Sequence, residues 1–137
     1  HNAAVRVLTQ GLLDEKLIKL SDVGSLDNAI ELGAYKRFYM HRTSHWLGMD
    51  VHDVGSYRDP LISQQAGQEK PWRLLQKNMV LTIEPGLYIR PADDIPNVFW
   101  NIGIRIEDDA VVTDQGCELI SRGVPVDPSE IEAIVRS

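Results

Sequence analysis

Apolar residues recur every three to four positions at the start of the chain, a spacing typical of an amphipathic helix. Ala4, Leu8 and Leu12 lie on one stripe, and Val5 lies beside them. We therefore expect a first helix over residues 1–20.

A second, shorter helical pattern follows the first. Ser21 or Asp22 is a suitable N-terminal cap for it, and Gly33 is a suitable C-terminal stop after Leu32. The apolar side of this second helix consists of Leu26, Ala29 and Ile30.

The second half of the chain has the two-residue alternation of strands. Residues 79–89 are apolar and β-branched, but Pro85 has no N–H for a sheet ladder, so the strand should end or bulge there. Residues 102–113 form a second strand, and polar residues 59–78 and 90–101 are expected to be loops. In this second strand Ile102, Ile104 and Ile106 point one way, and Gly103, Arg105 and Glu107 point the other. We expect the isoleucine face to pack in the core.

The last third of the chain predicts one more strand and a closing helix. A turn at residues 114–116 precedes a short strand at Glu118–Ile120. Asp127 is a suitable helix cap and Pro128 a suitable first helical residue, which predicts a helix over Ser129–Val135. The order of helices, strands and closing helix indicates an α+β fold, an antiparallel sheet with covering helices.

Composition narrows the class of protein. The chain has 137 residues and a formal net charge of −6, which fits a globular domain and argues against nucleic-acid binding, because phosphate binding needs a basic surface. No apolar run approaches the ~20 residues of a membrane-spanning helix, so we expect no membrane partner. Cys117 is the only cysteine, which excludes an internal disulfide and favours a cytoplasmic protein.

Residues 35–58 contain the densest group of chemically active side chains. Three histidines and a tryptophan fall within twelve residues, namely His41, His45, Trp46 and His52. Their spacing does not match the HExxH motif of zinc peptidases, and neighbouring Ser44 and His45 do not make a nucleophile–base pair, since such pairs are assembled from distant positions. The density indicates a functional site.

Two carboxylates complete the candidate chemistry. Glu84 ends an apolar run, so its side chain must meet a cation, a metal or solvent at the strand end. Arg105 and Glu107 share one strand face, where they form either a surface pair of little energetic weight or a buried charged group. Together His45, Glu84 and Glu107 suit Mn, Zn, Co or Fe, and the excess of carboxylates favours Mn-like ions.

Three segments, in this order, resemble the C-terminal motifs of the aminopeptidase P (Xaa-Pro aminopeptidase) family. They are MHRTSHWLGMDVHDVGSY, VLTIEPGLYI and GIRIEDDAVVT, and the match runs from about Tyr39 to Gly116. The resemblance implies a pita-bread (creatinase/aminopeptidase-like) fold, of which residues 1–137 would be the C-terminal part.

The resemblance also implies an activity and a set of site residues. The family hydrolyses the bond between an N-terminal residue and a following proline, so Xaa-Pro peptides would be the substrates, and it uses two divalent metal ions, usually manganese. By motif, His45, Glu84 and Glu107 would be metal ligands. His41 and His52 would lie near the scissile bond, Arg105 would support the metal carboxylates, and Glu84 would also serve as general base.

The chain departs from the family pattern in two respects. Arg42 stands where the related motif often has a small glycine, and the two aspartate ligands of the family are missing, because Asp14, Asp22 and Asp27 lie in expected helices or caps. The chain also begins with His1 and not Met. We therefore expect a fragment that lacks its upstream half and is inactive alone. Its uncovered sheet face should drive self-association into a homo-oligomer.

Two other functions fit the same motifs. The first is a prolidase, which cleaves only Xaa-Pro dipeptides. The second is a non-catalytic pita-bread relative that binds peptides or proteins. The presence of all three ligand types, at His45, Glu84 and Glu107, favours an active enzyme.

Overall fold

A computed structural model of the 137-residue chain describes residues 1–63, 67 and 69–137, which form two units. Unit 1 consists of residues 1–44 and 84–107, and unit 2 consists of residues 45–83 and 108–137. Each unit contains antiparallel strands, which confirms the predicted α+β class.

The first helix of unit 1, α1 (Asn2–Asp14), is shorter than predicted. The expected helix over residues 1–20 stops because Lys16 adopts a left-handed conformation with φ of 59°. The backbone N–H groups of Leu17 and Ile18 then turn back to the carbonyl of Leu12. Such a reversal satisfies helix-end carbonyls, but the residues themselves carry no glycine that would reveal it.

The predicted second helix is divided into two short ones, α2 (Leu20–Val23) and α3 (Leu26–Glu31). The cap of α3 is Ser25, whose side chain accepts a hydrogen bond from Asn28 N, and not Ser21 or Asp22 as expected. Gly33 follows with φ of 70°, as a helix stop requires, and leads into the 3-10 helix η1 (Ala34–Arg37).

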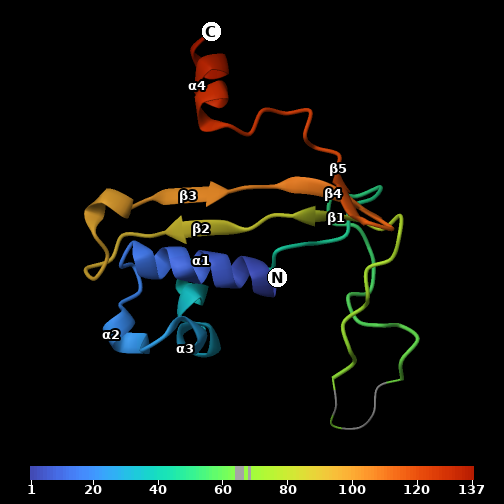
Figure 1. The fold of residues 1–137 in the computed structure, drawn as a ribbon, viewed down its shortest axis with the longest axis horizontal. Helices are drawn as coiled ribbons and strands as arrows, with labels where there is room; N and C mark the ends of the chain where they lie inside the picture. Colours follow the sequence, from blue (N-terminus) through green and yellow to red (C-terminus); the bar gives the residue numbers. More distant parts are fainter. Residues whose placement is uncertain (64–66, 68) are drawn as a thin grey trace. The chain divides into compact units, whose positions relative to one another are not determined.

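The core of unit 1 joins these helices to a two-stranded ribbon. In Figure 1, α1 lies below the pair β2 (Gly86–Ile89) and β3 (Ile102–Arg105), and α2 and α3 lie below α1. A short 3-10 helix, η2 (Asn97–Phe99), lies in the loop between the two strands. The buried cluster draws on the helices, on β2 and on that loop, with Leu12, Ile18, Val23, Ala29, Phe38, Ile89 and Ile95.

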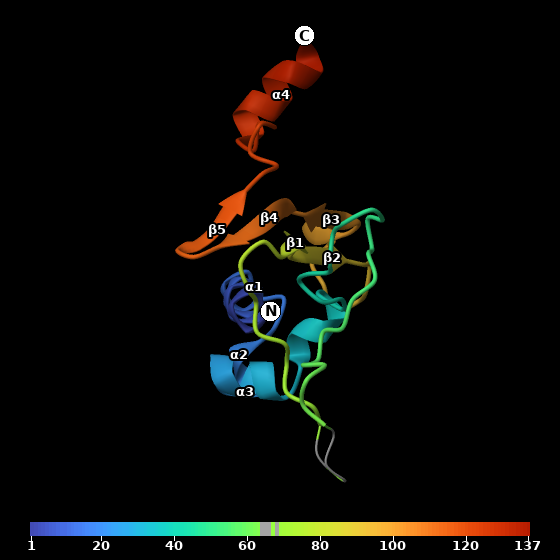
Figure 2. The same ribbon diagram turned by 90° about the vertical axis from the view of Figure 1, so that its right-hand side faces the viewer.

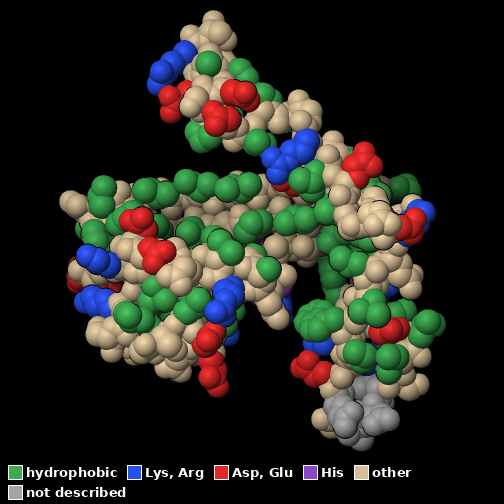
Figure 3. Space-filling model, viewed as in Figure 1, with side chains coloured by type: hydrophobic (Ala, Val, Ile, Leu, Met, Phe, Trp, Pro, Cys, Tyr) green, Lys and Arg blue, Asp and Glu red, His purple; other side chains and the backbone are tan. Residues whose placement is uncertain are grey.

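The isoleucine face of β3 does not pack in a core, and the prediction that it would is wrong. Ile102, Ile104 and Ile106 are 38%, 59% and 66% exposed. Figure 3 shows hydrophobic side chains in a row along this strand. Alternation reveals that a face is apolar, but burial requires a second layer packed against that face.

Unit 2 contains a three-stranded antiparallel sheet in the order β1-β4-β5 (Figure 2). Its strands are β1 (Val80–Ile83), β4 (Asp108–Thr113) and β5 (Gly116–Leu119). The predicted interruption at Pro85 is confirmed, since β1 and β2 are separate strands. The expected strand 102–113 is likewise divided into β3 and β4, and the expected Glu118–Ile120 strand begins earlier, at Gly116.

The segment between His45 and β1 is irregular, as predicted for residues 59–78, of which 64–66 and 68 lie outside the described residues. Two aromatic contacts order its described part. Trp46 stacks on Tyr57 with 5.7 Å between ring centroids, and the guanidinium of Arg58 lies 3.7 Å from the ring centroid of Trp72. Such stacked and cation–π contacts stabilise a loop that has little secondary structure.

The closing helix α4 (Pro128–Arg136) confirms the prediction from its capping residues. The Asp127 side chain accepts hydrogen bonds from the backbone N–H groups of Ser129 and Glu130. All residues of α4 are exposed. No helix in the described part of the chain combines the length and apolar character that crossing a bilayer requires.

Candidate metal centre

Glu84 lies between β1 and β2, where Pro85 interrupts the ladder, and its side chain is buried. The alternative of an exposed carboxylate at a strand end is therefore wrong. A buried carboxylate needs a positive partner, and Arg105 supplies one, with Nη1 3.3 Å from Glu84 Oε2. The backbone N–H of Glu84 donates to Thr43 O at 2.7 Å, which holds the segment before His45 beside it.

Strand register explains why Glu107 faces Glu84. The β2–β3 ladder pairs Gly86 with Arg105, and Ile106 N donates to Pro85 O at 3.1 Å. One residue beyond the Pro85–Ile106 contact, the same register places Glu107 across from Glu84. Because side chains alternate along a strand, Glu84, Gly86, Arg105 and Glu107 share one face.

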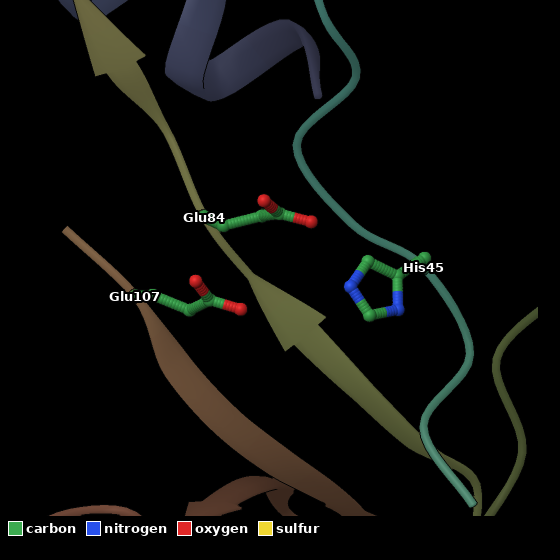
Figure 4. Close-up of side chains that lie close together, drawn as sticks. All are labelled: His45, Glu84 and Glu107. Carbon is green, nitrogen blue, oxygen red and sulfur yellow. The ribbon is translucent and has the colours of Figure 1, made fainter. Parts of the chain in front are cut away.

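The side chains of His45, Glu84 and Glu107 converge, as shown in Figure 4. Each offers one ligand atom, and these atoms all lie within 4.8 Å of one another. His45 Nδ1 lies 2.9 Å from the carbonyl oxygen of Trp46. A carbonyl only accepts, so Nδ1 carries the proton and Nε2 is the nitrogen that can bind a metal.

This donor set fits a divalent cation. Two carboxylates close together repel each other unless a positive charge lies between them, and one imidazole with two carboxylates suits ions such as Mn and Zn. The three metal ligands expected by motif are thus the residues that the fold brings together.

The backbone around His45 is held from the adjacent strand. His45 N donates to Thr82 Oγ1 at 3.2 Å, and Thr82 N donates to His45 O at 3.0 Å. Thr82 is almost completely buried in β1. A ligand held this firmly loses little further conformational entropy when it binds a metal.

A chain of hydrogen bonds leads from His41 to Glu84 through a residue that the sequence analysis missed. Arg105 Nε donates to Tyr88 Oη at 2.7 Å, and Tyr88 Oη lies 3.0 Å from His41 Nε2. His41 Nδ1 lies 2.7 Å from the carbonyl oxygen of Arg42 and therefore carries the proton. The Tyr88 hydroxyl thus accepts from Arg105 and donates to His41.

The charge on Arg105 is stabilised by the same contacts. The hydrogen bond to Tyr88 raises the pKa of the Arg105 guanidinium, and the negative charges of Glu84 and Glu107 raise it further. Two-residue alternation from Glu84 through Gly86 places Tyr88 on the same face, which was the signal available in the sequence. On that face, the Tyr88 hydroxyl links His41 to Arg105 by hydrogen bonds.

The other candidate residues lie outside the cluster of three ligands. The ring of His52 lies 4.2 Å from that of His45. The upstream aspartates have other contacts. Asp14 accepts from Gln10, and Asp27 pairs with Arg6. Among the described residues, the ligand cluster therefore contains His45, Glu84 and Glu107 and no aspartate.

Tyr39 and Thr43 form a buried hydrogen-bonded pair, and the Thr43 carbonyl accepts from Glu84 N. Tyr39 Oη and Thr43 Oγ1 are 2.5 Å apart, and both side chains are buried. Burial raises the pKa of the Tyr39 hydroxyl, and the negative charge of Glu84 adds to this effect. Tyr39 therefore remains a neutral hydrogen-bonding residue at physiological pH.

Comparison with known proteins shows which family this chain resembles. The family model described as "Metallopeptidase family M24" matches residues 1–114 of this chain. The Xaa-Pro aminopeptidase of Haemophilus influenzae is 42% identical over 135 residues, which are 98% of this chain and 28% of the relative. That of Escherichia coli is 44% identical over 131 residues, which are 96% of this chain and 26% of the relative.

A solved structure gives the same result for the fold. The aminopeptidase PepP of Pseudomonas aeruginosa superimposes with a TM-score of 0.85 at 47% identity, covering 99% of this chain and 28% of that one. The likeness confirms the predicted pita-bread type of fold. The chain spans about a quarter of the length of these relatives.

Proposed function

Since this chain belongs to metallopeptidase family M24, we propose that residues 1–137 form the C-terminal part of the pita-bread catalytic domain of a metal-dependent Xaa-Pro aminopeptidase. The observation that supports this proposal best is the convergence of His45, Glu84 and Glu107 within 4.8 Å. The residues that the motifs identify as metal ligands are the same residues whose ligand atoms lie close together. Relatives called Xaa-Pro aminopeptidase, at 42% and 44% identity, support the substrate class.

We propose two divalent metal ions, manganese in preference to others, as the cofactors. His45, Glu84 and Glu107 would hold them together with two aspartates from an upstream part of the protein. A bound divalent metal polarises the scissile carbonyl and stabilises the charge that develops on its oxygen. With three of the five ligands present, the 137-residue chain alone is expected to be inactive.

The residues of this chain have separate roles in the proposed hydrolysis. Glu84 takes a proton from the attacking water and delivers it to the proline nitrogen as the carbon–nitrogen bond breaks. Arg105 holds the Glu84 carboxylate at 3.3 Å, and Tyr88 holds Arg105. His41 and His52, which lie beside these groups, contact the peptide. The products are a free amino acid and a peptide that begins with proline.

Location and assembly are further parts of the proposal. The single Cys117 is exposed and forms no disulfide, which supports a cytoplasmic protein. The exposed face of Ile102, Ile104 and Ile106 supports self-association, since apolar patches of this kind are contact surfaces. A sedimentation measurement that finds only monomers of the 137-residue chain would contradict the homo-oligomer.

Peptide cleavage tests the proposed activity. The full-length natural protein carrying these residues should release alanine from Ala-Pro-Ala in the presence of Mn²⁺, and His45→Gln should reduce this rate to background. Cleavage of the dipeptide Ala-Pro alone would indicate a prolidase. Binding of Ala-Pro-Ala without cleavage would indicate a non-catalytic relative.

A control variant separates loss of a ligand from loss of folding. Gln76 lies in an exposed loop of unit 2, so Gln76→Ala should leave cleavage near the wild-type rate. Wild-type cleavage by the His45→Gln protein would contradict the assigned role of His45.

A further inference from the structure

A small network of side chains ties the first residue of β4, Asp108, to the segment that follows β5. Ser121 Oγ donates to Asp108 Oδ1 at 2.9 Å, and Arg122 Nη2 donates to Asp108 Oδ2 at 2.7 Å. Both oxygens of this carboxylate are therefore bound. All three residues belong to unit 2, so the network is formed within one compact part of the fold.

The Asp108 carboxylate is more buried than that of a surface ion pair. Its side chain is 13% exposed, whereas that of Asp114, which pairs with Lys77 after the other end of β4, is 64% exposed. Exposed pairs contribute little because water and salt screen their charges, and partial burial reduces this screening. The pair of Asp108 with Arg122 is therefore expected to fix the start of β4.

The backbone next to Asp108 is held by the same segment. Asp109 N donates to Ser121 Oγ at 3.0 Å, and Ile120 N donates to Asp109 O at 2.9 Å. The Ser121 hydroxyl thus accepts from one residue of β4 and donates to the residue before it. Asp108, Asp109, Ser121 and Arg122 are called the β4 clamp below.

The β4 clamp lies at the end of the ladder that adjoins the two carboxylate ligands. Asp108 pairs with Ile83, the last residue of β1, and this is the last pair of the β1–β4 ladder. The next residue on one strand is Glu84, and the next on the other is Glu107. The backbone positions of both proposed ligands therefore depend on this last pair.

The third ligand is connected to the β4 clamp through one strand. Asp109 pairs with Thr82, and Thr82 exchanges two hydrogen bonds with His45, at 3.0 and 3.2 Å. Both Thr82 and His45 belong to unit 2, like the clamp. Along the chain or across a strand pair, the clamp is thus separated from each of the three ligands by at most one residue.

Among the three ligands, Glu107 is the one whose direction depends most on its backbone. Its side chain is exposed, whereas Glu84 is buried and His45 is half-buried, so packing contributes least to the position of Glu107. It lies between two ladders, after the end of β3 at Arg105 and before the start of β4 at Asp108. Asp108 is therefore the fixed residue that directs Glu107 from the C-terminal side.

On the basis of the proposed function, we propose that Ser121 and Arg122 are positioning residues of the metal centre, which hold Asp108 and thereby direct the Glu107 carboxylate to the metal. Both residues lie beyond residue 114, where the match to the family model ends. The segment after that match thus contributes to the site without supplying a ligand.

The metal affinity of the full-length protein tests this proposal without any peptide. Arg122→Gln and Ser121→Ala should each weaken Mn²⁺ binding about tenfold, the lower end of the usual range for groups behind metal ligands, because each removes one of the two bonds to Asp108. Ser121→Thr keeps the hydroxyl and should keep the wild-type affinity. The control Lys77→Gln removes a charge and an ion pair near the other end of β4, and it should bind Mn²⁺ like the wild type.

A spectroscopic signature separates positioning of a ligand from a general loss of stability. Co²⁺ bound in place of Mn²⁺ has a visible absorption spectrum that depends on the ligand geometry around the ion. Arg122→Gln and Ser121→Ala should change this spectrum in the folded protein, whereas Lys77→Gln should keep it. An unchanged spectrum in both clamp variants, with or without lower stability to urea, would overturn the proposal.

A double-mutant cycle tests whether Arg122 acts through Asp108. In an Asp108→Asn background, Arg122→Gln should cause almost no further loss of Mn²⁺ affinity, because the charge that Arg122 pairs with has been removed. A further tenfold loss in that background would contradict the route through Asp108.

Failure of the proposed function has a different signature, because the wild type itself would then bind no Mn²⁺. Crystal structures of the wild-type and Arg122→Gln proteins decide the positioning role in that case. A Glu107 carboxylate displaced in the variant by about 1 Å, the scale at which a site becomes too loose to function, supports the role. A Glu107 carboxylate in the same place in both proteins overturns it.

Discussion

At the scale of single residues, the Tyr88 hydroxyl determines the direction of each hydrogen bond between His41 and Arg105. It accepts from Arg105 and donates to His41, whose other nitrogen is already donating to a carbonyl. One hydroxyl thus contacts both the His41 ring and the Arg105 guanidinium.

The clearest pH effect belongs to Asp94, which makes a two-point ion pair with Arg37 at 2.5 and 2.8 Å. The hydrogen bonds from Arg37 lower the pKa of Asp94 from 3.8 to about 2. The pair therefore stabilises the fold fully above pH 3.8, and this stabilisation is lost as the pH falls through 2. An NMR titration of the Asp94 carboxyl carbon should have its midpoint near 2.

Two variants test the assignment of this shift to Arg37. Arg37→Gln should return the Asp94 midpoint toward 3.8, whereas Arg90→Gln should leave it unchanged. A low midpoint that persists in Arg37→Gln would show that another group causes the shift.

At the scale of elements, the paired strands β2 and β3 set the geometry of the site. Gly86 lies across from Arg105, and Tyr88 lies across from Gly103. A Cβ on Gly86 would lie 2.8 Å from Tyr88 Oη and 3.0 Å from the backbone oxygen of Ile104. Any side chain at position 86 must displace the hydroxyl that holds Arg105 or push the strands apart.

We therefore expect Gly86→Ala to lower the free energy of unfolding by about 1–3 kcal/mol, the usual cost of overpacking. Urea denaturation measures this loss. The matched control is Gly103→Ala in the partner strand, where a Cβ would make only an ordinary 3.4 Å contact with Tyr88. Equal stability of the Gly86→Ala and wild-type proteins would mean that the close approach at position 86 is not maintained.

The same elements show what the sequence could predict and why. Pro85 and Asp127 act through their own backbone and neighbours, so the strand break and the α4 cap were predicted correctly. The reversal at Lys16 uses a positive φ at a residue that is not glycine, and the exposure of Ile104 depends on whether a second layer covers the strand. No local pattern contains that information.

In the candidate site, too, some residues were predicted from the sequence and one was not. Alternation placed Arg105 and Glu107 on one face, and motif resemblance identified His45, Glu84 and Glu107 as ligands, all of which the fold brings together. Tyr88 was missed because its partners Arg105 and His41 lie 17 and 47 residues away. Its alternation with Glu84 indicated a shared face, but not which polar groups it would contact.

At the scale of the whole molecule, the chain is about a quarter as long as its relatives and holds three converging ligands. Ile102, Ile104 and Ile106 remain exposed, and the described residues bring no aspartate to the ligand cluster. The proposed upstream part of the protein would contribute the two aspartates on the face that carries Glu107, opposite the isoleucines.

The most direct test of the account is the metal content of the full-length protein and its Glu107→Gln variant. After equilibration with Mn²⁺ and gel filtration, we predict two Mn²⁺ per chain in the wild type. Glu107→Gln should weaken Mn²⁺ binding by more than about a hundredfold, since even changes to groups behind metal ligands cost roughly 10–100-fold. The exposed Glu118 of β5 offers the control Glu118→Gln, which should retain wild-type Mn²⁺ content. Wild-type Mn²⁺ content and affinity in the folded Glu107→Gln protein would contradict the assignment of this cluster as the metal centre.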